Sequence, residues 1–223
     1  MARMWFLYLI TLFNFPASQA QNSFSEGTIT YDISIMPKQN QGKATTGLGG
    51  ATNTIYVKGV LARTEMASAL GNETVIQNSK TGEAVILKEY SGQKLMITLT
   101  KENWIEKNKK YRTVSFQLTN ETKTINGYNC KKAIGKLKDS SSIVVYYAPA
   151  LTIMNKEFNP VFTNLTGFPM EYELQTEKLI FNYKISKIDF GSVPASKFDA
   201  PKSGYRTMTF DENQKEKKGA SFL

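Results

Sequence analysis

Histidine is absent from this 223-residue chain, and cysteine occurs once, at Cys130. Histidine is the commonest general base and the commonest metal ligand among side chains, so its absence excludes Ser-His and Cys-His arrangements for nucleophilic catalysis. A single cysteine also excludes an internal disulfide. The sequence therefore indicates no catalytic residues, no metal site and no cofactor, and we predict that the protein is not an enzyme.

Long apolar runs are scarce too, apart from "MWFLYLITLFNF" near the amino terminus. This run is too short to cross a hydrocarbon core of about 30 Å as a helix. Arg3 precedes it, and Pro16 and small residues ending in Ala20 follow it, as in a cleaved secretory signal. We therefore predict a signal peptide over residues 1–20, cleavage near Ala20, and an exported mature protein, periplasmic or extracellular, without a transmembrane segment.

Arginine is also scarce in this chain. After position 20 only Arg63, Arg112 and Arg206 occur, so the basic charge is mostly lysine. Loss of Arg3 with the signal leaves 27 basic and 19 acidic residues, a net charge of +8. Specific nucleic-acid recognition favours arginine forks, so we expect no nucleic-acid partner. An exported basic protein can instead meet an anionic envelope surface.

Alternating strands make up most of what remains. In "TITYDISIM", Ile29, Tyr31 and Ile33 fall on one face and the polar residues between them on the other. About ten such segments predict one mainly β domain over residues 21–205, with a single antiparallel sheet wide enough to curl and one or two short helices or loops. Residues 101–112 form either a short helix or an irregular connection, and residues 206–223 a flexible tail.

Three middle strands are apolar on both faces, which means that protein or ligand covers both. The segments are "AVILK", "LMITL" and "IVVYY". In one interpretation, the Trp104 segment and residues 151–169 fold over the sheet as a second layer. In the other, the concave face holds an apolar ligand. Under the second interpretation, the ligand-binding residues are Val144 and Tyr146 on the sheet, with Phe162, Leu165 and Phe168 in a lid formed by "VFTNLTGFP".

Three stretches occur in an order that resembles a known family: "FSEGTITYDI", "ETKTINGYNCKKA" and "LTGFPMEYEL". The chain resembles, from about Phe24 to Tyr205, an exported bacterial family classed as a domain of unknown function and related to the GLPGLI-type secreted proteins. "GFP" stands here where that group often has "GLPG". The resemblance implies the lipoprotein-localisation-factor fold, a curved half-barrel closed by helices over an apolar concavity, and it brings no catalytic residues.

The leading functional hypothesis is therefore an exported, non-enzymatic binding module that holds a lipid or another hydrophobic ligand on the concave face. The alternative is a structural or protein-interaction module of the cell envelope with no ligand cavity. Glu171 and Glu173 share a strand face, where they are either solvated or bridged by a cation.

Asn126-Gly127 is a strong hairpin signal, because both residues tolerate a positive φ. In the strand that follows, Cys130 alternates with Asn129 and Lys131 and falls on the more apolar face. A buried free cysteine acts as a small hydrophobe, whereas a reactive thiol needs solvent access and a depressed pKa.

We predict that Cys130 reacts slowly with a thiol reagent in the native protein and readily in denaturant. The measurement is the rate of labelling by an absorbance-reporting disulfide with and without urea. Fast labelling of the native protein would instead identify a reactive thiol.

Overall fold

The computed structural model describes residues 22–38, 50–138, 141–175 and 179–220. The predicted signal peptide over residues 1–20 lies outside the described residues. The strands are β1 (Asn22–Phe24), β2 (Glu26–Pro37), β3 (Gly50–Lys58), β4 (Leu61–Ser68), β5 (Gly71–Asn78), β6 (Ala84–Tyr90), β7 (Gln93–Leu99), β8 (Ser115–Ile125), β9 (Tyr128–Lys136), β10 (Ser142–Ala148), β11 (Leu151–Ile153), β12 (Phe168–Gln175), β13 (Leu179–Asp189) and β14 (Arg206–Thr209). The helices are α1 (Lys101–Lys107) and α2 (Phe210–Ala220), and the short 3₁₀ turns include η3 (Pro160–Phe162) and η4 (Ala195–Phe198).

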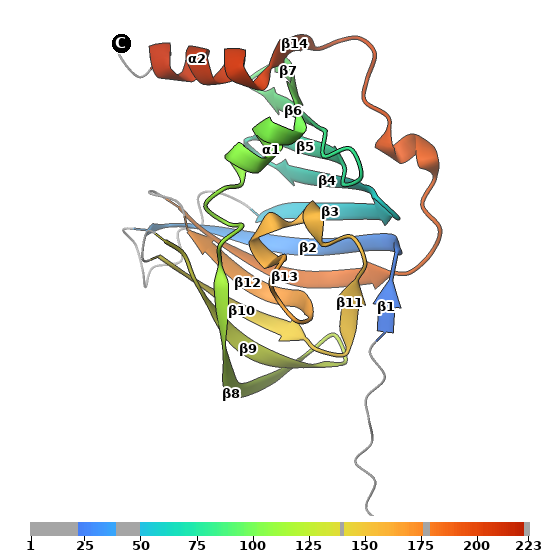
Figure 1. The fold of residues 1–223 in the computed structure, drawn as a ribbon, viewed down its shortest axis with the longest axis vertical. Coiled ribbons are helices and arrows are strands. Elements are labelled where there is room, and N and C mark those ends of the chain that lie inside the picture. Colours follow the sequence, from blue (N-terminus) through green and yellow to red (C-terminus); the bar gives the residue numbers. More distant parts are fainter. Residues whose placement is uncertain (1–21, 39–49, 139–140, 176–178, 221–223) are drawn as a thin grey trace, which may run out of the picture.

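Twelve of the strands form one sheet in the order β14-β7-β6-β5-β4-β3-β2-β13-β12-β10-β9-β8. Neighbours pair antiparallel except β14 and β7, and β1 pairs with β11 in a separate parallel ladder. One half of this sheet curls into a half-barrel, formed by the neighbouring strands β3, β2, β13, β12, β10, β9 and β8 (Figure 1). The other half, formed by β4, β5, β6, β7 and β14, continues it as a wing. The predicted curved, mostly antiparallel sheet is confirmed, and it is wider than the ten strands expected.

The hairpin signal in the opening of β9 is also confirmed. Asn126 and Gly127 have φ values of 47° and 80° and connect the paired residues Ile125 and Tyr128. The expected strict alternation along β9 is wrong. Cys130 and Ala133 are both fully buried in the same core although they lie three positions apart. The pairing of β8 with β9 is irregular in the same region, and this irregularity changes the face that successive residues occupy.

The inside of the half-barrel is filled by the chain itself. Phe162 and Leu165, between β11 and β12, are buried there together with Phe168. The Phe162 ring lies 4.7 Å from the Tyr172 ring, edge to face. The Tyr31 hydroxyl donates a 2.7 Å hydrogen bond to the carbonyl of Pro169. Residues 151–169 therefore form the second layer over this half of the sheet, as one of the two interpretations expected.

The wing is covered on both faces, which explains its two-sided strands. On one face, Ile86 and Ile97 pack with Trp104 of α1, as expected for the Trp104 segment. On the other face, Leu87 packs with Phe198 of a segment that the sequence did not predict as a cover. We call this segment, residues 190–205, the strap; it runs from the end of β13 to β14 along the side of the wing (Figure 1).

The carboxyl-terminal region is more regular than the sequence indicates. Instead of a flexible tail from residue 206, the structure has β14 paired with β7, followed by α2. The physical reason is that Met208 and Phe210 are buried with Leu99 and Trp104 in the apolar cluster of the wing. Among the described residues, neither helix has the length and apolar character needed to cross a membrane.

We predict that Phe162→Ala lowers the free energy of unfolding by about 3–5 kcal/mol, because the change empties a large volume in a packed core. Urea unfolding followed by circular dichroism measures the effect. The matched control is Phe190→Ala, since Phe190 is 52% exposed. Equal losses in the two variants would contradict the packing described for Phe162.

Candidate functional site

The five residues that the sequence assigned to ligand binding are not brought together. Val144 and Tyr146 lie on one face of β10, where the Val144 side chain is 37% exposed. The residues between and beside them point the other way, into the core. Phe162, Leu165 and Phe168 are part of that core. The expected lid thus lies on the other side of the sheet from Val144, while Tyr146 is partly buried and also packs against this core.

Little space remains inside the half-barrel next to the expected lid. The hollow beside Phe158, Phe162 and Pro169 measures about 10 Å³, which is near the lower limit for one water molecule. A ligand bound there would have to displace buried aromatic side chains. Ligand-sized hollows lie elsewhere on the described surface. One of about 550 Å³, beside Ala51 and Ala67, is shallow, and two others have a larger volume.

The first hollow has a volume of about 630 Å³ and opens on the polar face of β2, β13, β12 and β10. Val144 and Tyr146 line it, together with charged residues from four strands. Its charged lining residues are Asp32, Lys123, Glu171, Glu173 and Lys184. We call it the polar hollow.

Two ion pairs lie in and beside the polar hollow, Lys123–Glu171 and Lys132–Glu121. Lys123 Nζ lies 2.7 and 2.8 Å from the two carboxylate oxygens of Glu171. Glu121 accepts hydrogen bonds from Lys132, at 2.7 Å, and from the Tyr146 hydroxyl. The hydrogen bond from Lys132 is the main cause that lowers the pKa of Glu121, and the same carboxylate raises the pKa of Tyr146. These contacts order the side chains of Lys123, Glu171 and Tyr146.

The Glu171–Glu173 pair accordingly has the polar surroundings of a solvated strand face. Lys123 neutralises Glu171, and Glu173 accepts a 2.7 Å hydrogen bond from the Gln175 amide. In the part of the chain that the structure describes, no group of three or more acidic, cysteine or histidine side chains could hold a metal ion.

The second hollow, of about 590 Å³, lies on the face of the wing that the strap crosses. Its floor is a row of paired residues on β5, β6 and β7: Ile76, Val85 and Thr98. Phe198 and Ala200 of the strap form one wall. Small-molecule pockets are typically of this size and mostly apolar. We call it the strap groove.

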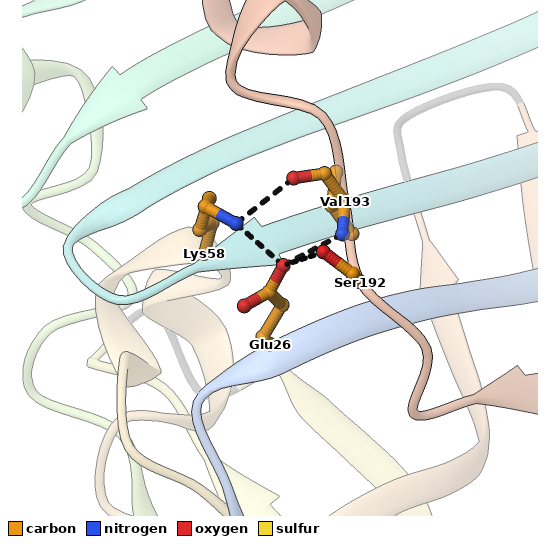
Figure 2. A network of polar contacts seen from close by, with 4 residues as sticks. All are labelled: Glu26, Lys58, Ser192 and Val193. Carbon is orange, nitrogen blue, oxygen red and sulfur yellow. Dashed lines mark hydrogen bonds and ion pairs between the residues drawn. The ribbon is translucent and has the colours of Figure 1, made fainter.

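A network of polar contacts fastens the beginning of the strap to the sheet (Figure 2). Glu26 Oε1 accepts hydrogen bonds from Lys58 Nζ at 2.6 Å, from the Ser192 hydroxyl at 3.0 Å and from the Val193 N–H at 2.7 Å. Lys58 Nζ also donates to the carbonyl of Val193, at 3.0 Å. One ion pair between β2 and β3 thus holds both the N–H and the carbonyl of the same strap residue.

These contacts lower the pKa of Glu26 to about 2, with the hydrogen bond from Lys58 as the largest cause. Two other contacts attach the rest of the strap, at Lys197 and at Tyr205, to the wing. Arg63 Nη1 donates to the carbonyl of Lys197 at 3.1 Å, and the Tyr205 hydroxyl donates to Glu89. The strap is therefore anchored on both sides of Phe198, the residue that forms a wall of the groove.

Sequence reasoning missed the strap because its apolar residues follow no periodic pattern. Val193 and Phe198 are its buried anchors, five positions apart in a segment with two prolines and several small residues. The two-sided pattern of "AVILK" was the available signal, since Val85 and Leu87 on one face required a cover. The pattern does not say which segment supplies it.

Cys130 occupies the position expected of a structural cysteine. Its side chain is fully buried in the half-barrel core, and desolvation raises the pKa of its thiol to about 11. Lys123 is near enough to lower that pKa slightly, but burial outweighs this effect. A thiol with little thiolate at neutral pH is a poor nucleophile.

We predict that Glu26→Gln destabilises the protein at pH 7 and that the difference from the parent shrinks as the pH falls from about 4.5 to 2. The sign follows from linkage: a carboxyl whose folded pKa lies below its unfolded pKa stabilises the fold above the unfolded pKa, and the gain is lost as the pH falls through the folded pKa. Urea unfolding at several pH values measures it.

The control is Glu173→Gln, which changes a carboxylate bonded to an amide rather than to a lysine. A constant difference between parent and Glu26→Gln over the whole pH range would contradict the assigned role of the Glu26–Lys58 network.

Comparison with known proteins shows a likeness of fold without a likeness of sequence. No family model matches the chain, and no curated protein matches it. The structure of PNGF-II in space group P21 is similar to this chain with a TM-score of 0.50 and 15% identity, over 86% of this chain and 33% of PNGF-II. The chain thus spans about a third of the length of that protein, and the likeness concerns the fold alone.

Two further structures are less similar. The crystal structure of MucB has a TM-score of 0.38 and 11% identity, over 82% of this chain and 60% of MucB. A β-barrel-like protein of a domain of unknown function, DUF1849, from Brucella abortus has a TM-score of 0.35 and 7% identity, over 75% of this chain and 98% of that protein. At such scores neither likeness bears on function.

Proposed function

We propose that the protein is an exported, non-enzymatic binding module and that it holds a small apolar or lipid-like ligand in the strap groove. The observation that carries the proposal is the groove itself: a ligand-sized hollow with an apolar floor at Ile76 and Val85 and an apolar wall at Phe198. The half-barrel interior offers no comparable space beside Phe162. The ligand class is the one expected from the sequence, in a different place.

The geometry of the strap supports this choice of site. Phe198 lies between the Arg63 contact with Lys197 and the Tyr205 contact with Glu89, so the wall of the groove is formed before a ligand arrives. A preformed site binds more tightly because less conformational entropy is lost on binding. The groove is open to solvent, and Asn78 at the end of β5 and Glu83 just before β6 also line it, so a ligand can enter without unfolding the strap.

A second candidate function is protein interaction through the polar hollow. The specific observation is that Val144 is exposed there beside the Tyr146 ring, which Lys123 approaches to 5.0 Å from the ring centroid. Exposed aromatic and aliphatic side chains within a polar surround are typical of interface centres. In this alternative, the residues assigned to a ligand floor contact a protein partner.

The two candidates are separated by the same substitution at two valines, Val85→Asp in the strap groove and Val144→Asp in the polar hollow. We predict that the delipidated parent binds a hydrophobic fluorophore with 1:1 stoichiometry, that Val85→Asp weakens this binding at least tenfold, and that Val144→Asp leaves it unchanged. Fluorescence titration measures the affinity, and circular dichroism verifies that each variant is folded.

Loss of binding in Val144→Asp with retention in Val85→Asp would place the site in the polar hollow and contradict the proposal. Absence of stoichiometric binding in the parent would contradict ligand binding altogether. Should Val85→Asp unfold, Thr98→Trp replaces it, because that side chain lines the groove and a larger ring fills it.

A further inference from the structure

The rim of the strap groove carries charge of one sign. The ionisable residues among its lining are Glu83, just before β6, and Asp211, in the first turn of α2, and both are acidic. The other polar lining residues are neutral: Gln77, Asn78, Thr98, Thr100, Asn103 and Thr209. Lys101, which follows Thr100, packs its side chain against Gly82 and does not line the groove. An acidic rim is unusual for a chain with a net charge of +9.

Side chains occupy part of the backbone donors at the two helix starts near the rim. At α1, Asn103 N–H donates to the Thr100 hydroxyl and Thr100 N–H donates to the Asn103 side chain, which closes a capping box. At α2, the Thr209 N–H donates to the Glu212 carboxylate and the Glu212 N–H donates to the Thr209 hydroxyl. Two N–H groups at each helix start are thus bonded to side chains rather than open to an anion.

Asp211 retains capacity to accept a hydrogen bond from a ligand. One of its carboxylate oxygens accepts a long, 3.3 Å bond from the Asn103 amide, and each carboxylate oxygen can accept two hydrogen bonds. Glu83 is exposed and lines the same hollow. An apolar chain on Ile76 and Val85 would therefore share this hollow with two carboxylates.

From this arrangement we infer that the strap groove takes an amphiphile with an apolar chain and a cationic, amine-type head. The inference rests on the proposed function and specifies its ligand class. The chain contacts Ile76, Val85 and Phe198, and the ammonium group lies at the rim with Glu83 and Asp211. Like-charge repulsion at the same rim disfavours an anionic head, against the general attraction that a basic protein exerts on anions.

The test uses three ligands with the same chain and heads of similar size but different charge: decylammonium, 1-decanol and decanoate, each below its solubility limit and critical micelle concentration at pH 7.5. Isothermal titration calorimetry of the delipidated mature protein measures the affinity. We expect decylammonium to bind about three- to tenfold more tightly than decanol, a ratio set by two partly exposed ion pairs, and decanoate to bind most weakly.

The double variant Glu83→Gln, Asp211→Asn should bind decylammonium and decanol with similar affinity. Glu171→Gln, Glu173→Gln in the polar hollow is the matched control, because it removes the same number of carboxylates from the other hollow; it should keep the preference. If none of the three ligands binds, the proposed function fails.

If the three ligands bind the parent with equal affinity, or if the preference survives in the double variant, ligand binding stands and the inference of a cationic head is overturned. The same holds if the control loses the preference, because the selectivity would then come from the net charge of the protein and not from the rim.

Discussion

The architecture depends on one constraint: a sheet whose strands are apolar on both faces must be covered twice. In the wing, Ile86 faces α1 while Leu87, the next residue, faces the strap. Trp104 and Phe210 supply the large rings on one side, and Phe198 is the buried ring of the strap on the other. The strap has no regular secondary structure beyond η4, so polar anchors such as the Glu26–Lys58 pair fix its course.

The two halves of the sheet differ in how completely they are covered. The half-barrel is closed over by residues 151–169, whose aromatic side chains pack against Tyr172 and leave almost no space. The strap is too narrow to cover its whole face of the wing, and the corner beyond Phe198 and Ala200 remains open as a groove. A curved sheet of this kind therefore does not need a hollow interior to have an apolar site.

The sequence predicted the elements well and their packing only in part. Alternation in "TITYDISIM" identified the buried face of β2, and Asn126-Gly127 identified a turn, because both signals are local. Apolar residues on both faces of β6 showed that two covers exist. Which segments provide them depends on long-range contacts, such as that of Phe198 with Leu87, and no periodicity encodes these contacts. For the same reason the sequence placed Val144 and Phe162 in one site, although the sheet separates them.

The central claim is that an apolar ligand binds between the strap and the wing, outside the half-barrel. The most direct measurement is nuclear magnetic resonance of protein with labelled isoleucine, leucine and valine methyl groups, titrated with a decyl-chain ligand. The account predicts that the methyl signals of Ile76 and Val85 shift in proportion to saturation, while those of Val144 and Leu165 stay in place. Shifts confined to Leu165 and its neighbours would show a ligand inside the half-barrel and would contradict the account.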